Sequence, residues 1–337
     1  MIPTSTLYNE DALHCMERIE NESIDLIIAD PPYFNVVSEK WDRQWRTETE
    51  FIEWLEKVFA EFARILKPTG SLYLFCYNHM SAKISVALSK YLEVLSHIVW
   101  NKPNGRHLMV QRSSQRKYFP QTEHVLFAES KNAPVAQKEM LEPLRYYMNE
   151  WTRAGLTKKE AEQVVGSSAR HYFNASQWSL PSKERYEQLR SYARAKDKNI
   201  YPRSYSDLQH EYMVRRKQAR RPFSADEVDF NTDLWEFKTV VSYKGRHPCE
   251  KPLQLYAQII KASSREGDTI LDPFLGSGNS GVLAKELKRN FLGIEIDQEY
   301  FNRCKQKINN LDDKSAIFNK TRKKQPHTIA LETRSTL

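Results

Sequence analysis

The sequence is poor in cysteine and contains no long apolar segment. Its 337 residues include four cysteines, which lie far apart and form no C-x-x-C pair. We therefore expect free thiols in a reducing compartment, with no disulfide and no zinc or other metal site. No apolar run is long enough to cross a bilayer, so the sequence predicts neither a transmembrane helix nor a membrane partner.

The N-terminus also lacks the features of a targeting segment. Residues 1–4 read Met-Ile-Pro-Thr, without a basic patch followed by an apolar core. The sequence therefore predicts no signal peptide. Together with the expected free thiols, this favours a cytoplasmic protein.

Acidic residues are the minority among the charges. Lysine and arginine number 51 against 43 aspartate and glutamate, which gives a formal net charge of +8. The excess is uneven, because residues 183–221 hold 12 basic and 5 acidic residues, and residues 314–337 hold six basic and one acidic. Any single charge fits an ordinary solvated surface, but the clusters indicate nucleic acid as a partner.

One stretch near the N-terminus combines a strand with polar groups. Residues 23–29 form an apolar run with one charge, which predicts a central strand covered on both faces. Asp30 ends the run, and Pro31 and Pro32 stop the strand before Tyr33 because proline cannot donate a ladder hydrogen bond. These groups would lie at a sheet edge where ligands bind. Taken alone, the stretch fits a simple strand stop equally well.

Strands and helices alternate through the first 130 residues. Apolar residues at helical spacing predict a helix over 51–66, and Pro68 and Gly70 end it. Residues 35–49 show no period, so we expect a loop. Further strands are expected at 6–8, 71–76, 94–100, 124–128 and 237–241, with helices at 11–20, 81–91 and 253–263. This alternation predicts an α/β fold with a doubly wound, mostly parallel sheet, and length suggests about two domains.

The character of the chain changes between residues 131 and 236, where polar helical segments replace the apolar strands. Residues 146–154 and 181–195 can be helical, and Thr157 with Glu160 matches a capping box. The short helices beside Gly166 resemble a helix-turn-helix, although such pairs also occur in proteins that do not bind DNA. The basic residues expected to contact phosphate groups are Arg215, Arg216, Lys217, Arg220 and Arg221.

A second strand end lies late in the chain. Residues 269–272 predict a strand that ends in Asp272, and a glycine-rich turn and a helix follow. Glycines let the backbone approach a ligand closely, and the helix N-terminus would point toward it. The next strand, 291–297, carries Glu295 and Asp297 at its end, where dinucleotide folds bind ribose hydroxyls.

A nicotinamide dinucleotide fold is the main alternative for this strand end. That fold usually holds a pyrophosphate with G-x-G-x-x-G, whereas the turn here reads Gly276-Ser277-Gly278 after Asp272. An acid in the turn would repel a pyrophosphate, but it suits a ligand with a sulfonium or amino group and no phosphate. A glycine-rich turn can also be only a tight connection.

Three motifs together indicate a family. The first is Asp30-Pro31-Pro32-Tyr33, the second is His247-Pro248-Cys249-Glu250-Lys251-Pro252, and the third is Asp272-Pro273-Phe274-x-Gly276-Ser277-Gly278. In this order they resemble the catalytic motif, the H-P-T-E-K-P segment and the cofactor motif of β-type DNA adenine-N6 methyltransferases that use S-adenosylmethionine. Cys249 stands where that family usually has threonine.

The resemblance implies a Rossmann-like methyltransferase fold with a circularly permuted motif order and an inserted, mainly helical target-recognition domain. By this comparison, residues 1–130 form the catalytic half and residues 237–311 the cofactor-binding half. Residues 131–236 form the target-recognition region, and residues 312–337 form a basic tail that we expect to be disordered.

The resemblance also assigns roles by position. Asp30 and the carbonyl of Pro31 would accept the amine hydrogens of a flipped-out adenine, Pro32 would stiffen the turn, and Tyr33 would stack on the base. Glu295 would bind the ribose, with Ile296 or Asp297 near the adenosyl ring. The expected cofactor-binding residues are Asp11, Asp272, Pro273, Phe274, Gly276, Ser277, Gly278, Glu295, Asp297, His247, Lys251 and Pro252.

The implied function is site-specific methylation of adenine N6 in double-stranded DNA. Aspartate before Pro-Pro-Tyr favours adenine, because cytosine-N4 enzymes more often carry serine there. A cytosine-N4 enzyme, an RNA methyltransferase and a non-catalytic DNA-binding subunit stay open as alternatives. A cognate restriction endonuclease would share the same site, and the sequence leaves the oligomeric state open.

Overall fold

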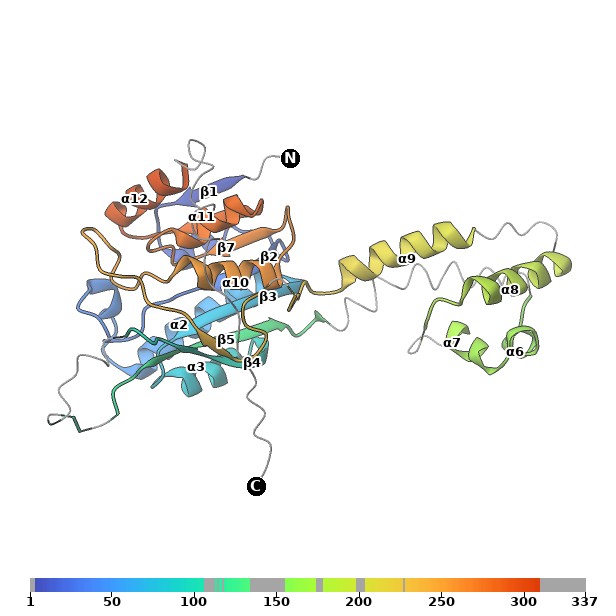
Figure 1. Cartoon of the computed structure of the whole chain (residues 1–337), viewed down its shortest axis with the longest axis horizontal. Coiled ribbons are helices and arrows are strands. Elements are labelled where there is room, and N and C mark those ends of the chain that lie inside the picture. The colour runs from blue at the N-terminus through green and yellow to red at the C-terminus, as the bar shows by residue number, and fades with distance from the viewer. Residues whose placement is uncertain are drawn as a thin grey trace, which may run out of the picture.

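Within the residues that the computed structural model describes, eight strands form one sheet (Figure 1). The described residues are 4–105, 113, 115–116, 118–133, 155–173, 178–197, 204–226 and 228–309. The strands lie in the order β1-β8-β7-β2-β3-β5-β4-β6. Their bounds are β1 Ser5–Tyr8, β2 Ile24–Ala29, β3 Leu66–Cys76, β4 Leu92–Asn101, β5 Thr122–Ser130, β6 Leu234–Glu236, β7 Thr269–Asp272 and β8 Asn290–Ile294.

The sheet is mostly parallel. The strands β1, β8, β7, β2 and β3 all run parallel to one another, and β6 runs parallel to β4. Only β5 is antiparallel, to β3 on one side and to β4 on the other. The predicted α/β class with a mostly parallel sheet is confirmed.

The strand predicted at 237–241 is wrong. The strand β6 ends at Glu236, and the chain then leaves the sheet. Phe237 is still buried, but Val241 is 79% exposed. The amide of Thr239 donates instead to the side chain of Asn104, at 2.7 Å. Strand-forming residue types alone therefore did not pair here, because β-propensity depends on packing against neighbouring strands.

Helices cover both faces of the sheet, as a doubly wound fold requires. On one face α1, α2 and α3 pack around a core that includes Phe59 and Phe62. On the other face α10, α11 and α12 pack around Ile259 and Phe291. The bounds are α1 Ala12–Met16, α2 Glu48–Ile65, α3 Ser81–Leu88, α10 Leu253–Ser263, α11 Asn279–Glu286 and α12 Gln298–Asn309.

The connections around β2 and β7 create a topological switch point. The chain leaves β2 through α2 to β3, and it leaves β7 through α11 to β8, on the opposite face and in the opposite direction. The two strands are themselves paired, with Leu26 opposite Ile270 and Ile27 opposite Leu271. Ligands of open α/β sheets bind at the carboxyl ends of strands at such a point.

Among the other described helices, α6 Lys158–Val165, α7 Arg170–Phe173 and α8 Lys183–Lys196 stand away from the sheet, and α9 Tyr205–Ala219 runs from them back to the sheet domain (Figure 1). They share a small core that includes Ala161, Tyr186 and Leu189. The capping box at Thr157 and Glu160 is confirmed. The segment expected as the second helix of a helix-turn-helix forms only a 3-10 turn and the four-residue α7.

Two predicted segments fall outside the described residues, namely the helix at 146–154 and the basic tail at 312–337. The proposed domain boundaries stay predictions. Across the described ranges, no helix is long and apolar enough to cross a membrane.

Candidate active site

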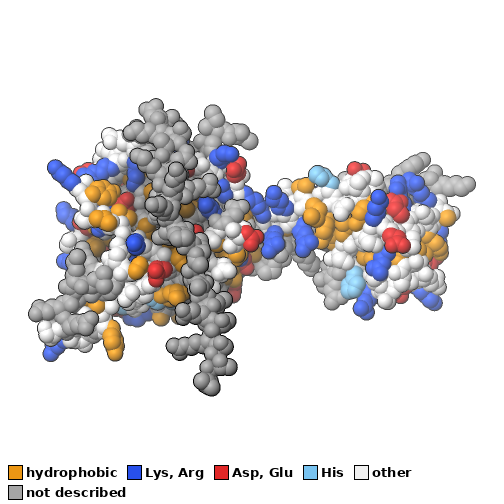
Figure 2. Space-filling model, in the orientation of Figure 1, with side chains coloured by type: hydrophobic (Ala, Val, Ile, Leu, Met, Phe, Trp, Pro, Cys, Tyr) orange, Lys and Arg blue, Asp and Glu red, His pale blue; other side chains and the backbone are white. Residues whose placement is uncertain are grey.

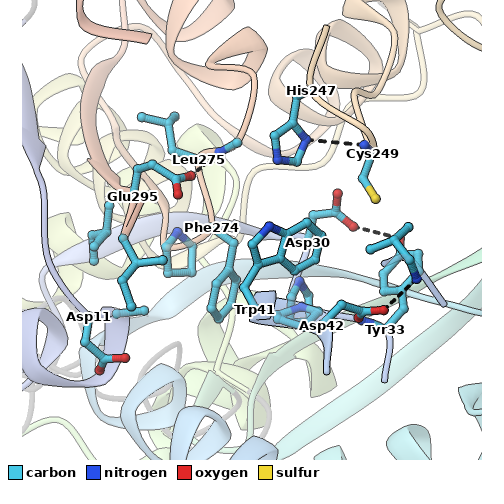
Figure 3. A pocket seen from close by; sticks show the side chains of 18 of the residues that line it. Asp11, Asp30, Tyr33, Trp41, Asp42, His247, Cys249, Phe274, Leu275 and Glu295 are labelled. Atoms are coloured by element: carbon cyan, nitrogen blue, oxygen red, sulfur yellow. Dashed lines mark hydrogen bonds between the residues drawn. The ribbon is translucent and has the colours of Figure 1, made fainter. Parts of the chain in front are cut away.

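A cavity of about 370 Å³ opens at the switch point between β2 and β7 (Figure 3). This size falls within the range of roughly 300–1,000 Å³ that is typical of small-molecule sites. Among the predicted site residues, those that line the cavity are Asp11, Asp30, Pro31, Pro32, Tyr33, His247, Pro273, Phe274, Gly276, Ser277 and Glu295. The structure thus brings together most of two motifs whose first residues, Asp30 and Asp272, are 242 residues apart in the chain.

Asp30 lies at the end of β2 with both carboxylate oxygens engaged. The Tyr33 hydroxyl donates to Oδ1 at 2.7 Å, and the Lys251 ammonium donates to Oδ2 at 2.6 Å. Burial raises the pKa of Asp30, although Lys251 opposes that rise. Burial likewise raises the pKa of Tyr33 well above its usual value, so the phenol stays protonated and donates.

Lys251 differs from its predicted position in the cofactor pocket. Its side chain is 3% exposed, and its ammonium pairs with Asp30 and also lies 3.5 Å from Glu123. Lys102 donates to the other oxygen of Glu123 at 2.9 Å. Pro252 follows Lys251 as the buried N-cap of α10 and does not line the cavity. The H-P-C-E-K-P segment therefore reaches the catalytic carboxylate through Lys251.

Asp42 fixes the turn that follows Asp30, a role that the sequence did not indicate. This carboxylate is fully buried and accepts from the amide of Tyr33 at 2.6 Å. It also accepts from the amides of Val36 and Val37, at 2.6 Å and 2.8 Å. One aspartate in the expected loop thus satisfies three backbone donors and orders the chain beside the cavity.

Asp272 holds the glycine-rich turn after β7 through hydrogen bonds to residues on both sides of the turn. Asp272 is buried outside the cavity and accepts from Ser280 at 2.5 Å and from the amide of Phe274 at 3.1 Å. Burial raises the pKa of Asp272 to about 7, although these hydrogen bonds oppose it. Gly276 and Gly278 have φ of +51° and +74°, in the region that favours glycine, and Gly278 caps α11.

Glu295 closes this turn from β8. Its carboxylate accepts from the amides of Gly276 at 2.8 Å and Asp297 at 2.9 Å, and it faces the cavity. Burial raises the pKa of Glu295. Asp297 is not among the residues that line the cavity, and its carboxylate accepts from the amide of Glu299, at the start of α12, at 2.8 Å. Ile296 lines the cavity, so of the two residues expected near the adenosyl ring the geometry supports Ile296.

Asp11 and His247 complete the wall. Asp11 is the N-cap of α1 and accepts from the amide of His14 at 3.1 Å. The ring of His247 stacks on Trp41, with ring centroids 6.0 Å apart. Burial, aided by the charge of Lys251, lowers the pKa of His247 to about 4, so the imidazole is neutral near pH 7.

The lining fits S-adenosylmethionine and not a dinucleotide. Carboxylates of Asp11, Asp30 and Glu295 face the cavity, and Lys40 is the one lysine or arginine among its described lining residues. Such a wall repels phosphate but suits a cationic sulfonium, and the neutral His247 adds no opposing charge. Glu295 retains acceptor capacity for ribose hydroxyls after its two backbone contacts.

The predicted DNA-binding residues lie away from the cavity. The groove beside α9 has a volume of about 960 Å³ and is lined by Arg216, Lys217 and Arg220, and Figure 2 shows Lys and Arg side chains gathered between the sheet and the separate helices. Arg215 pairs with Glu211 at 2.7 Å. Arg221 was predicted to contact phosphate groups, but its guanidinium forms an ion pair within the protein.

Arg221 lines this groove, and its guanidinium also contacts side chains of the sheet. Its guanidinium pairs with Glu129 at 2.7 Å and lies over the ring of Phe127 at 4.7 Å. It also donates to the hydroxyl of Ser71, in the middle of β3, at 3.3 Å. The assignment of Arg221 to phosphate contact therefore needs correction, because an ion pair within the protein holds its charge.

Comparison with known proteins agrees with this geometry. The family model for DNA methylases that modify N6 or N4 matches residues 24–306. The chain is 28% identical over 303 residues to the DNA adenine methyltransferase YhdJ of Escherichia coli (strain K12), covering 88% of this chain and 79% of that protein. It is 26% identical over 322 residues to the type II methyltransferase M2.LlaDCHI of Lactococcus lactis subsp. cremoris, covering 90% and 88%.

Solved structures support the fold. The PvuII DNA methyltransferase, described as cytosine-N4-specific, aligns with a TM-score of 0.53 and 13% identity over 90% of this chain and 86% of its own. The M1.HpyAVI complex with S-adenosylmethionine aligns with a TM-score of 0.50 and 20% identity over 90% and 100%. The Rossmann-like methyltransferase fold is thus confirmed. The chain belongs to the DNA methylase family and is a DNA methyltransferase that uses S-adenosylmethionine.

Proposed function

We propose that this chain transfers a methyl group from S-adenosylmethionine to N6 of adenine at a specific site in duplex DNA. The observation that carries the proposal is the position of Asp30, held by two hydrogen bonds at the edge of a cavity that suits a phosphate-free cationic nucleoside. The Escherichia coli relative is named as a DNA adenine methyltransferase, which supports adenine as the base.

The residues around Asp30 suit activation of an exocyclic amine. The amine of adenine is a poor nucleophile because its lone pair is delocalised into the ring. Asp30 would accept one amine hydrogen and the carbonyl of Pro31 the other, which draws the lone pair out of the ring. S-adenosylmethionine supplies, when bound, a methyl group on a positively charged sulfur. Holding the amine in line contributes much of the remaining acceleration.

Adenine must leave the base stack to reach this turn, which costs a few kcal/mol. The wall of the cavity offers Tyr33 as one contact for the flipped base. Its hydroxyl is already bound to Asp30, and its ring is buried against Tyr77 with centroids 6.2 Å apart. Stacking of the base on Tyr33 stays a prediction. The Tyr33 hydroxyl also orients Asp30 by donating a hydrogen bond to it.

A nucleoside digest tests the base and the substrate. The purified chain is incubated with duplex DNA and S-adenosylmethionine carrying a labelled methyl group, and the products are digested and separated by mass spectrometry. We expect N6-methyladenine. Label only in N4-methylcytosine would overturn the choice of base, and label in RNA but not in duplex DNA would identify an RNA methyltransferase. Absence of transfer to either would favour a non-catalytic DNA-binding role.

We assign DNA contact to the separate helices α6–α9 and to the exposed residues of the basic groove beside α9. Lys217 and Arg220 are exposed, and no ion pair is seen for either side chain among the described residues. Such cations neutralise DNA phosphates and release counterions. They position the duplex without reading its sequence.

The double substitution Lys217→Glu with Arg220→Glu is expected to weaken DNA binding for all sequences alike. The slope of log affinity against log salt should fall by about two, since each lost phosphate contact removes about one. Fluorescence anisotropy with a labelled duplex at several salt concentrations measures this slope. Lys57→Glu, an exposed lysine on α2, is the control. An unchanged slope in the double variant would remove these residues from the DNA interface.

Two further assignments follow from the relatives. Several are named as type II methyltransferases, and we propose that a restriction endonuclease with the same site accompanies this chain. We also place the protein in the cytoplasm, because its proposed substrate is cellular DNA. Restriction of unmethylated DNA by lysates of the source cells would test the first proposal.

A further inference from the structure

Lys251 lies between two carboxylates that come from different parts of the chain. Its ammonium donates to Asp30 at 2.6 Å and is 3.5 Å from Glu123 on β5. Glu123 also accepts from the Tyr33 hydroxyl at 3.2 Å and from Lys102 at 2.9 Å. The charged groups form a chain from Lys102 through Glu123 and Lys251 to Asp30, and the four formal charges cancel. The Tyr33 hydroxyl links the two carboxylates.

This cluster is shielded from solvent. The side chain of Lys251 is 3% exposed, and those of Asp30, Glu123 and Lys102 are 14–15% exposed. A buried charge that loses its partner is strongly unfavourable, so each member depends on the others. A lysine with a single buried carboxylate would resist protonation of that carboxylate, because the ammonium would then be unpaired.

We propose that Glu123 is a positioning residue that keeps Lys251 paired, so that Asp30 can accept a proton from the methylated amine. The inference rests on the proposed function of Asp30. In this step one N–H bond of the methylated, positively charged amine breaks and its electron pair stays on nitrogen. An O–H bond forms on Asp30, and Lys251 remains an ammonium paired with Glu123.

The pKa directions agree with this division of roles. Burial would raise the pKa of Glu123, but Lys251 and Lys102 hold it below its usual value, so Glu123 stays ionised. Burial outweighs Lys251 at Asp30, whose pKa is raised. The carboxylate poised to gain a proton is therefore the one at the cavity.

Other titratable groups near Asp30 do not replace Glu123. Burial raises the pKa values of the Cys76 and Cys249 thiols to about 12, and that of Tyr256 well above its usual value, so these groups are neutral near pH 7. Asp272 faces Asp30 from β7 and has its own partner in Ser280. Among the described groups that face Asp30, Glu123 contacts both Lys251 and the Tyr33 hydroxyl.

The test compares the isosteric variant Glu123→Gln with the neutral variant Lys251→Gln. Glu123→Gln removes a negative charge, so the pKa of Asp30 should fall and the acid limb of the kcat profile should move to lower pH. Lys251→Gln removes a positive charge, so the same limb should move to higher pH. We expect kcat at the optimum to fall about tenfold in Glu123→Gln, as loss of one charge-assisted contact implies, with an unchanged KM for S-adenosylmethionine.

Glu129→Gln is the matched control, because Glu129 lies on the same strand in an ion pair with Arg221. It should leave the pH profile in place. A ¹³C NMR titration of aspartate carboxyl groups, with Asp30 assigned from the Asp30→Asn spectrum, reads the pKa without enzymatic activity. An unshifted Asp30 pKa in Glu123→Gln would overturn the proposal even if Lys251→Gln fails to fold. Absence of DNA methylation by the unaltered chain would instead overturn the proposed function.

Discussion

Asp30→Asn is expected to lower kcat for DNA methylation by about 10²–10⁴-fold, the usual contribution of a positioned proton acceptor. Asparagine keeps the shape of the side chain, but it carries no charge and replaces one acceptor oxygen with a donor. The affinity for S-adenosylmethionine should change little, because the cofactor contacts assigned to Glu295 and the turn at Gly276 lie on other strands. Single-turnover methylation and calorimetric cofactor titration measure the two quantities separately.

Asp25→Asn provides a control on the same strand. Asp25 accepts from Lys67 at 2.7 Å and from the amide of Thr269 at 2.9 Å, at the end of β2 away from the cavity. This variant loses a partly buried ion pair of similar kind, so it should lower stability without lowering kcat. If Asp30→Asn kept a rate near that of the unaltered chain, Asp30 would not be the acceptor, and the aspartate turn would serve only to end its strand.

The two strand ends were predictable because their signals are local. The apolar run before Asp30 predicts a buried strand, and Pro31 and Pro32 predict where that strand ends. The same holds for β7, whose glycines at 276 and 278 adopt the positive φ that the turn needs. Their proximity followed from a rule about doubly wound sheets, and the pairing of Leu26 with Ile270 confirms it.

The contacts that orient Asp30 were not predictable from local pattern. Lys251 is 221 residues from Asp30. Glu123 lies on β5, which is antiparallel to β3, so a model of the sheet with only parallel strands would put Glu123 in the wrong place. Asp42 stands in a stretch without period, where one carboxylate replaces regular structure by accepting three backbone amides. The depth at which a charged residue lies depends on tertiary neighbours, which spacing along the chain does not report.

In the basic cluster at residues 215–221, too, the sequence did not show which side chains are held by contacts within the protein. Composition marked residues 215–221 as one group, yet the structure divides it. Arg221 is held by Glu129 and Phe127, whereas Lys217 and Arg220 remain exposed on the groove. Charge in a sequence indicates a class of partner, and only side-chain contacts tell which charges are available to that partner.

Glu295→Ala is expected to weaken S-adenosylmethionine binding by about 10²–10⁴-fold. The carboxylate would receive two ribose hydroxyls, and each hydrogen bond to a charged group contributes about 1.5–3 kcal/mol. It also accepts from the amides of Gly276 and Asp297, at 2.8 Å and 2.9 Å, so its removal loosens the turn that surrounds the ligand. Calorimetric titration measures the affinity.

The rate at saturating cofactor separates this role from that of Asp30. Glu295→Ala should recover much of its kcat as S-adenosylmethionine is raised, because the residue contacts neither the base nor Asp30. Glu299→Ala on α12 is the control, since Glu299 is an exposed glutamate beyond Asp297 whose side chain pairs with Arg303. A loss of kcat that persists at saturation, with unchanged affinity, would mean that Glu295 acts on the reacting groups and that the ribose lies elsewhere in the cavity.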